Sequence, residues 1–290
     1  MRGICIVALG YRIYGEMAAN LAASLRVVSP NVQIALLYDS DGINTLTEEH
    51  LKLFNQRIEI GGDEITVADS KHYQIAKLLV YKYSPFDFTI YIDADSLWGD
   101  KPVEDLFERF KDESFYVGAH SIYDKATQRL DALGYTHWCR PYEACVYHNL
   151  DWIQQTISGL FYFKKCQLTE DLFITSLKVY FDPDTPNFIW ANGKPDEYCF
   201  NVALAKHGIK LDRNSLIYFD KLHGKADEGA MFSNHYGIAI GGHKIEYNLR
   251  RIYDRRAHEA CQKLNVSSFA SIEKSQAIQS RNNKKNAVLM

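Results

Sequence analysis

The first hundred residues alternate short apolar runs with helical patterns, and this alternation most constrains the fold. Apolar runs rich in β-formers occupy positions 4–10, 32–39 and 88–92, which predicts three buried strands. Segments 16–28 and 72–83, which lie between these runs, carry apolar residues at helical spacing. Strand–helix alternation of this kind favours a mostly parallel sheet with helices on both faces. We therefore expect an α/β protein with three layers, α/β/α.

The pattern is less regular after residue 99. We expect helices at 102–110 and 195–208 and strands at 114–120 and 157–165. Residues 121–157 lie between these segments, are rich in aromatic side chains and show weak periodicity. A stretch of that length without clear elements is more often functional than idle.

The sequence contains no repeat and no interior linker, which predicts one domain at 1–265 followed by a tail. The tail, 266–290, is polar and basic, and we expect it to be poorly ordered.

Hydrophobic residues make up 47% and charged residues 24% of the 290 positions, which is ordinary for a globular protein. No apolar run approaches the roughly 20 residues that a membrane-spanning helix needs. The apolar run at 4–10 is short, ends at Gly10 and leads into a helical pattern, so it predicts a first strand rather than a secretory signal. We expect a cytoplasmic protein without a transmembrane segment.

The six cysteines form no C-x-x-C pair, and most of them lie in apolar runs. This pattern favours free buried thiols over a zinc site or a disulfide framework.

The net charge of −3 is unevenly distributed along the chain. From Lys244 to the end there are ten Lys or Arg and four acids, which gives +6 and leaves −9 for the first 243 residues. A basic end can bind phosphate or an acidic surface. The alternative is a solvated helix followed by a loose end.

Asp93 and Asp95 lie one residue apart where the strand predicted at 88–92 ends. Residues at i and i+2 of a strand project from the same face, so the two carboxylates can point together. Ligands of open α/β sheets bind beyond the carboxyl ends of the strands. Two carboxylates there suit Mn²⁺ or Mg²⁺ bridged to a diphosphate. The alternative is a pair of solvated acids in a turn.

The segment around these acids resembles nucleotide-sugar-dependent glycosyltransferases of the GT-A fold. A helix carrying Lys77, a Ser-Pro-Phe-Asp turn at 84–87 and a strand ending in Asp-Ala-Asp follow the order seen in that family. Positions 6–26 are similar to the family's first strand and helix, which surround the nucleotide. Positions 156–165 and 195–204 are similar to its acceptor-side strand and to its Asp-Glu/Gln helix start. The resemblance covers residues 3 to 245, approximately, and implies a Rossmann-like sheet.

The resemblance implies a metal site. Asp95 would be the principal ligand, and Asp93 would contact metal, ribose or both. Glycosyltransferase family eight adds a ligand from a late H-x-x-G-x-x-K motif, which the sequence NHYGIAIGGHK does not match in spacing. His235 is the preferred candidate and His243 the alternative, and the mismatch leaves membership of family eight open. Lys244 would bind the diphosphate or serve as an ordinary surface lysine.

The resemblance also implies a nucleotide pocket. Ala8, Gly10 and Tyr11 follow the first strand, where a small residue permits close approach and an aromatic ring can stack on uracil. Asp39 would accept a hydrogen bond from base or ribose, and Lys77 would meet a phosphate or an acid. Structural turns account equally well for Gly10 and Asp39.

Asp196 and Glu197 are the candidate catalytic residues, and Ser158 and Gly159 would lie near the donor sugar. A carboxylate at this place can bind sugar hydroxyls or act as the base that an inverting transfer needs. The alternative explanation is the favourable interaction of acids with a helix N-terminus.

The aromatic residues of 121–157 would form an acceptor platform or a local core. Their members of interest are Tyr135, Trp138, Tyr142, Tyr147 and Trp152.

The sequence therefore predicts a Mn²⁺- or Mg²⁺-dependent hexosyltransferase that uses a nucleotide-diphosphate sugar, with UDP as the expected nucleotide. The acceptor would be a glycan, a lipid-linked sugar, a protein hydroxyl (including the enzyme's own tyrosine, as in glycogenin) or a modified DNA base. Two alternatives remain: a sugar-phosphate nucleotidyltransferase, which the poorly basic loop after the first strand disfavours, and a non-catalytic nucleotide-sugar-binding protein.

Overall fold

The computed structural model describes residues 1–126, 140–186, 193–211, 220–221, 237–239 and 247–269. The chain divides into two compact units. Unit 1 comprises Met1–Cys5, Ile60–Ile92 and Phe107–Tyr218, and unit 2 comprises Ile6–Glu59, Asp93–Leu106 and Phe219–Met290.

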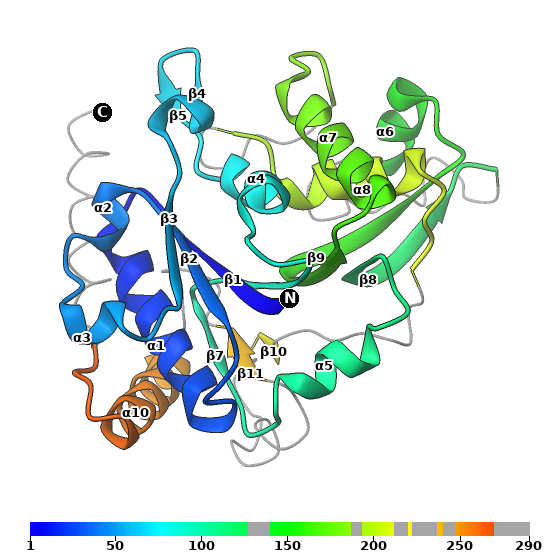
Figure 1. The fold of residues 1–290 in the computed structure, drawn as a ribbon. Coiled ribbons are helices and arrows are strands. Elements are labelled where there is room, and N and C mark those ends of the chain that lie inside the picture. Colours follow the sequence, from blue (N-terminus) through cyan, green and yellow to red (C-terminus); the bar gives the residue numbers. More distant parts are fainter. Residues whose placement is uncertain (127–139, 187–192, 212–219, 222–236, 240–246, 270–290) are drawn as a thin grey trace. The chain divides into compact units, whose positions relative to one another are not determined.

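Unit 1 contains a mixed sheet in the order β1-β6-β9-β8 (Figure 1). β1 pairs with β6 in parallel, with Ile4 opposite Ile90, whereas β9 runs antiparallel to both of its neighbours. The strands are β1 (Arg2–Ala8, which continues into unit 2), β6 (Phe88–Ile92), β8 (Phe115–Asp124) and β9 (Trp152–Lys164).

β6 lies between β1 and β9 in this sheet. Its four residues from Thr89 to Ile92 are all buried, which is typical of a strand covered on both sides. Tyr91 stacks on Phe161 of β9 at a centroid distance of 4.5 Å, and Phe161 also contacts Phe173 and Phe200. The core of unit 1 is therefore largely aromatic.

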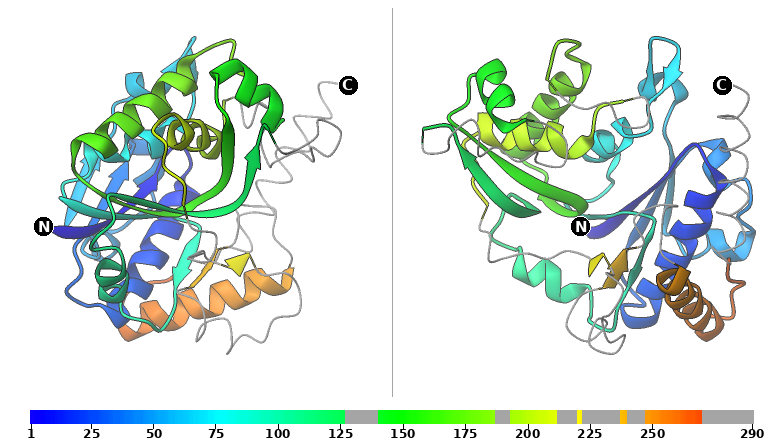
Figure 2. Two further views of the ribbon diagram at one scale, coloured as in Figure 1. Left: turned by 90° about the vertical axis from the view of Figure 1, so that its right-hand side faces the viewer. Right: turned by 180° about the vertical axis from the view of Figure 1, so that it is seen from behind.

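Three helices of unit 1 pack on one another beside β9: α4 (Ile75–Tyr83), α7 (Gln167–Phe181) and α8 (Asp196–Lys206). Both views of Figure 2 show them on the same face of the strands β8 and β9. A shorter helix, α6 (Pro141–His148), begins with proline, whose fixed φ suits a first helical turn.

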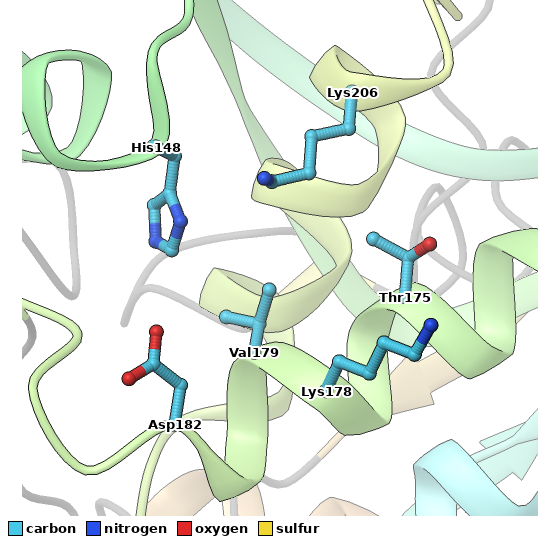
Figure 3. Close-up of a pocket in the computed structure, with 6 residues that line it drawn as sticks. All are labelled: His148, Thr175, Lys178, Val179, Asp182 and Lys206. Atoms are coloured by element: carbon cyan, nitrogen blue, oxygen red, sulfur yellow. The ribbon is translucent and has the colours of Figure 1, made fainter.

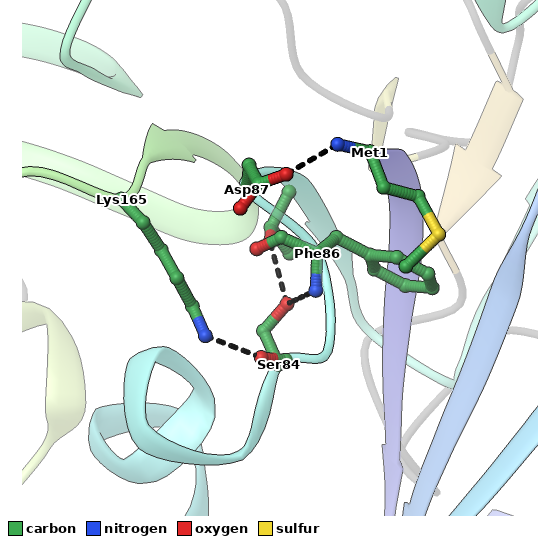
Figure 4. A network of polar contacts seen from close by, with 6 residues as sticks. Met1, Ser84, Phe86, Asp87 and Lys165 are labelled. Carbon is green, nitrogen blue, oxygen red and sulfur yellow. Dashed lines mark hydrogen bonds and ion pairs between the residues drawn. The ribbon is translucent and has the colours of Figure 1, made fainter.

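The Ser84–Asp87 turn joins α4 to β6 (Figure 4). The hydroxyl oxygen of Ser84 accepts the N–H of Phe86 at 3.2 Å, and Lys165 Nζ donates to the Ser84 carbonyl at 2.6 Å. The amine of Met1 forms an ion pair with Asp87. The turn thus fixes the point at which the central strand begins.

Unit 2 pairs β2 (Ile34–Tyr38) in parallel with β3 (Gln56–Glu59). A second sheet has the order β10-β11-β7, formed by Asp220–Lys221, Gly237–Ala239 and Ser96–Trp98. The helix α1 (Arg12–Val28) packs against β7 and against α10 (Tyr247–Lys263). After α10, Ser267 donates to Glu49, and its carbonyl lies 2.8 Å from Nε2 of His50.

The remaining described elements are short. They are α2 (Ser40–Ile43), α3 (Glu48–Leu51), η1 (Gly62–Ile65), β4 (Thr66–Val67), β5 (Ser70–Lys71) and α5 (Glu104–Arg109).

The predicted α/β class is confirmed, and the sheet is mixed because β9 runs antiparallel to β6 and β8. The expected long irregular stretch at 121–157 is wrong in part, because the end of β8, all of α6 and the start of β9 fall within it. Free thiols are confirmed for the five cysteines in the described ranges. Among the described helices, none has the length and apolar character needed to cross a membrane.

Candidate active site

Asp93 and Asp95 lie in a turn directly after β6, which ends at Ile92. The N–H of Ser96 donates to the carbonyl of Asp93 at 3.1 Å, and this bond closes the turn before β7 begins. Both acids are half-buried. The expectation that strand alternation aligns them is wrong, since neither residue belongs to the strand; the turn sets their directions.

Asp95 lies close to α10. Burial raises the pKa of Tyr253, and the negative charges of Asp95 and Asp254 raise it further. The negative charge of Asp95 therefore acts on the buried Tyr253 hydroxyl of unit 2.

The donor chemistry of the two acids fits the predicted metal, because carboxylate oxygens suit Mn²⁺ and Mg²⁺. No group of three or more potential ligands occurs among the described residues. His235, His243 and Lys244 lie outside those residues. The third protein ligand remains a prediction.

The loop after β1 is held by Asp39. Its two carboxylate oxygens each lie 3.0 Å from the N–H of Gly10, and Oδ1 also accepts the N–H of Gly42 at 2.8 Å. Gly10 has φ +77°, a left-handed conformation that glycine adopts without strain. Asp39 is thus the clamp of this loop and the N-cap of α2. Contact with a nucleotide is not required to explain it.

Close backbone packing surrounds the same loop. A Cβ at Gly42 would collide with the carbonyl of Ala8, and a Cβ at Gly15 would collide with the carbonyl of Gly42. Ala8 is fully buried, whereas Tyr11 is 59% exposed. The Tyr11 ring, which lies 6.4 Å from the Tyr14 ring, therefore presents an exposed aromatic surface beside this glycine turn.

Lys77, Ser158, Asp196 and Glu197 meet in unit 1. The Ser158 hydroxyl donates to Asp196, and Lys77 Nζ lies 3.4 Å from the same carboxylate oxygen and 3.3 Å from the hydroxyl. The N–H of Ser158 donates to Glu197 at 3.3 Å. Asp196 and Glu197 are the predicted catalytic residues, and Lys77 and Ser158 are predicted to bind the donor. The structure brings these four residues together, with Lys77 paired to Asp196.

An irregularity in β9 makes this arrangement possible. The β8–β9 register shifts between Val117 and Gly118, where the partners change from Phe161 to Ile157. Ser158 and Gly159 fall inside that gap, and β6 pairs no further than Leu160. The N–H of Ser158 is therefore available to a side chain of α8.

Asn201 is a positioning residue within the helix-start segment 195–204, for which the sequence predicted no role. Its side-chain oxygen accepts the N–H of Thr156 at 3.0 Å and the Thr156 hydroxyl at 2.8 Å. Asn201 follows Glu197 by four residues, and Thr156 precedes Ser158 by two, so both bonds join one face of α8 to one face of β9. A polar residue one helical turn after the acids was the available sequence signal.

The aromatic residues expected to form an acceptor platform do not share one environment. Tyr135 and Trp138 lie outside the described residues. Tyr142 and Trp152 are half-buried, and Lys210 lies over the Trp152 ring at 4.9 Å. Tyr147 is exposed, with its hydroxyl bonded to Asp182.

No family model matches the sequence, and the search of curated proteins gave no match. Among solved structures, the chain is similar to the WbbM bifunctional glycosyltransferase, with TM-score 0.56 and 11% identity over 88% of this chain and 49% of that chain. The chain thus spans about half the length of that structure. This likeness shows a shared fold.

Two further solved structures are more distant. The galactosyltransferase LgtC in complex with donor and acceptor sugar analogues has TM-score 0.43 and 16% identity over 70% of each chain. Mouse xyloside xylosyltransferase 1 has TM-score 0.43 and 10% identity over 72% of this chain and 83% of that chain. Similarity at this level adds no argument to the one from WbbM.

Proposed function

We propose that the protein is a metal-dependent glycosyltransferase that moves a hexose from a UDP-sugar to a hydroxyl acceptor. The observation that carries this proposal is the Asp93–Asp95 turn directly after β6, in a chain that shares its fold with a glycosyltransferase. In such a fold the ends of the central strands are where ligands bind.

Asp95 and Asp93 would hold Mn²⁺ or Mg²⁺, with His235 or His243 as the third protein ligand. The metal would supply positive charge for the diphosphate as it leaves the sugar. Lys244 would add a second positive charge to the same group. The two acids suit this role because their half-buried position limits competition from water.

The loop after β1 would bind the nucleotide. Tyr11 offers an exposed ring for stacking on the base. Gly10 and Ala8 let the backbone come close to the ligand, and Asp39 keeps the loop in its left-handed turn.

The unit 1 cluster would bind the donor sugar. Asp196 accepts a hydrogen bond from the Ser158 hydroxyl and lies 3.4 Å from the Lys77 ammonium. Its remaining lone pairs would accept hydrogen bonds from sugar hydroxyls. Glu197 is fixed through the Ser158 N–H and is the second candidate for this role or for the base. Gly159, which follows Ser158, would lie beside the sugar. In a retaining transfer the leaving diphosphate can take the acceptor's proton instead.

The test is hydrolysis of UDP-hexoses, followed as UDP release, with Mn²⁺ and with a chelator. We expect turnover that requires the metal and falls about 100-fold in Asp95→Asn, since the charge that holds the metal is lost. Asp100→Asn removes a neighbouring exposed acid and serves as the matched control. Equal turnover in the Asp95 and Asp100 variants would contradict the proposal.

A further inference from the structure

A pocket of about 290 Å³ lies in unit 1, away from the residues proposed to bind the donor. It is lined by His148, Thr175, Lys178, Val179, Asp182 and Lys206 (Figure 3). Lys206 is the last residue of α8, and Asp196 is the first. Ten residues of helix separate them by about 15 Å. The pocket is therefore distinct from the cluster at Ser158.

His148 is held rigidly at the edge of this pocket. Its Nε2 lies 2.9 Å from the Tyr198 hydroxyl and 2.8 Å from the Thr185 hydroxyl, and all three side chains are buried. Burial and the nearby Lys206 lower the pKa of His148 to about 4, so the ring is neutral near pH 7. The ring's other nitrogen, Nδ1, has no hydrogen-bond partner among the described residues.

The two lysines of the pocket carry unused donors. The ammonium groups of Lys178 and Lys206 form no hydrogen bond or ion pair with any other described residue. Both side chains are exposed, and both line the pocket. Each offers three N–H donors to a ligand.

The pocket also contains hydrogen-bond acceptors and negative charge, which offset the positive charge of the two lysines. The Asp182 carboxylate lines the pocket. Its two oxygens lie 3.1 and 3.0 Å from the Tyr147 hydroxyl, which donates to them, and Oδ1 also accepts the N–H of Asp184 at 3.2 Å. A carboxylate has about four lone-pair sites, so acceptor sites remain for a ligand.

The helices α6 and α8 end at His148 and Lys206, and helix C-termini carry partial negative charge. The end of α7 contributes less, because the Lys194 ammonium donates to the carbonyls of Val179 and Asp182. This potential disfavours a phosphate or carboxylate ligand, while the two lysines disfavour a cation.

The balance suits a neutral ligand whose polar groups both donate and accept. Sugar hydroxyls have this property. Val179 gives an apolar contact for a ring face, and the exposed ring of Tyr147 lies beside Asp182. The volume is near the lower end of the roughly 300–1,000 Å³ range of small-molecule pockets, which is room for one ring.

We infer that this pocket is a saccharide-binding site, separate from the donor site, that takes one neutral hexose residue of a glycan. Lys178, Lys206 and Asp182 would bind its hydroxyls, and Val179 would contact its ring.

The test uses the full chain without metal or donor, labelled at histidine, and titrated with methyl glycosides of glucose, galactose and mannose. The His148 resonance, assigned with His148→Gln, reports binding at this pocket. We expect one glycoside to shift it, with a Kd that rises at least about tenfold in Lys178→Gln/Lys206→Gln. Lys71→Gln, another exposed lysine of unit 1, is the control and should bind like the native chain.

Three outcomes would overturn the inference. The first is that none of the glycosides shifts the His148 resonance. The second is that the double lysine variant binds a glycoside as tightly as the native chain does. The third is that inorganic phosphate shifts the resonance at a lower concentration than every glycoside, which would define an anion site. Because the titration contains no metal or donor, a failure of the proposed transferase activity leaves its result unaffected.

Discussion

Replacing Gly15 by alanine tests the close packing that supports the loop after β1. Gly15 lies in the first part of α1, where alanine normally stabilises a helix over glycine by about 1 kcal/mol. Here the new Cβ would fall well inside 3.0 Å of the Gly42 carbonyl oxygen. We therefore expect Gly15→Ala to lower the free energy of unfolding instead of raising it.

The magnitude follows from the atom that blocks the methyl group. A backbone carbonyl cannot rotate away, so α1 and α2 must separate, and overpacking of this kind costs roughly 1–3 kcal/mol. If the overpacking cost is at its upper value of about 3 kcal/mol and the helix-propensity gain is about 1 kcal/mol, Gly15→Ala should destabilise the protein by about 2 kcal/mol. For a chain of this size that is about 4–8 °C in Tm.

Thermal unfolding followed by circular dichroism measures this effect. Gly62→Ala is the control, because a Cβ at Gly62 would meet no atom within 4 Å and the residue lies in η1. Its Tm should change by less than about 2 °C. A Gly15→Ala variant as stable as the native chain, or more stable, would refute the packing argument.

Two further predictions concern charged and titratable groups of unit 1. Because the pKa of His148 is lowered to about 4, the unfolded chain binds a proton that the native chain does not between pH 6.5 and 4. The free energy of unfolding should therefore fall as pH drops through this window, by at most about 1.4 kcal/mol per pH unit from this group. Urea unfolding at pH 7 and pH 5 measures this fall, which should be smaller in His148→Gln than in the native chain. An equal fall in both would contradict the assignment to His148. Asp196→Asn should destabilise by roughly 1–3 kcal/mol, because it removes the charged oxygen that accepts from Ser158 and lies 3.4 Å from the Lys77 ammonium. Adding Lys77→Met should restore the stability but not UDP release; recovery of both would show that the pair is only structural.

Much of the fold was predictable because hydrophobic periodicity is a local signal. The run that contains Ile90 and Ile92 marks a buried strand on its own, and the acids after it mark its end. The directions of Asp93 and Asp95 were not predictable, since the bond from Ser96 that closes their turn depends on where the strand stops.

Helix α7 was missed although its sequence carries a signal. Leu172, Phe173 and Val179 lie at helical spacing and are buried. The segment contains no motif of the resembled family, so its helical periodicity is the only signal that it carries.

Contacts between distant positions were beyond sequence reasoning. Thr185 and Tyr198 lie 37 and 50 residues from His148, and only the folded chain brings the three side chains together. The resemblance to one family predicted separate roles for Ser158 and Asp196, but the hydrogen bond between them was not predicted.

The central claim is that Asp95 holds a divalent metal on the diphosphate of the donor. Electron paramagnetic resonance of Mn²⁺ measures this directly, because the signal of free aqueous Mn²⁺ disappears when the ion binds. In the presence of UDP, the native chain and Asp100→Asn should remove this signal equally, while Asp95→Asn should need at least about tenfold more protein. An Asp95→Asn chain that binds Mn²⁺ and UDP as tightly as the native chain would contradict the account.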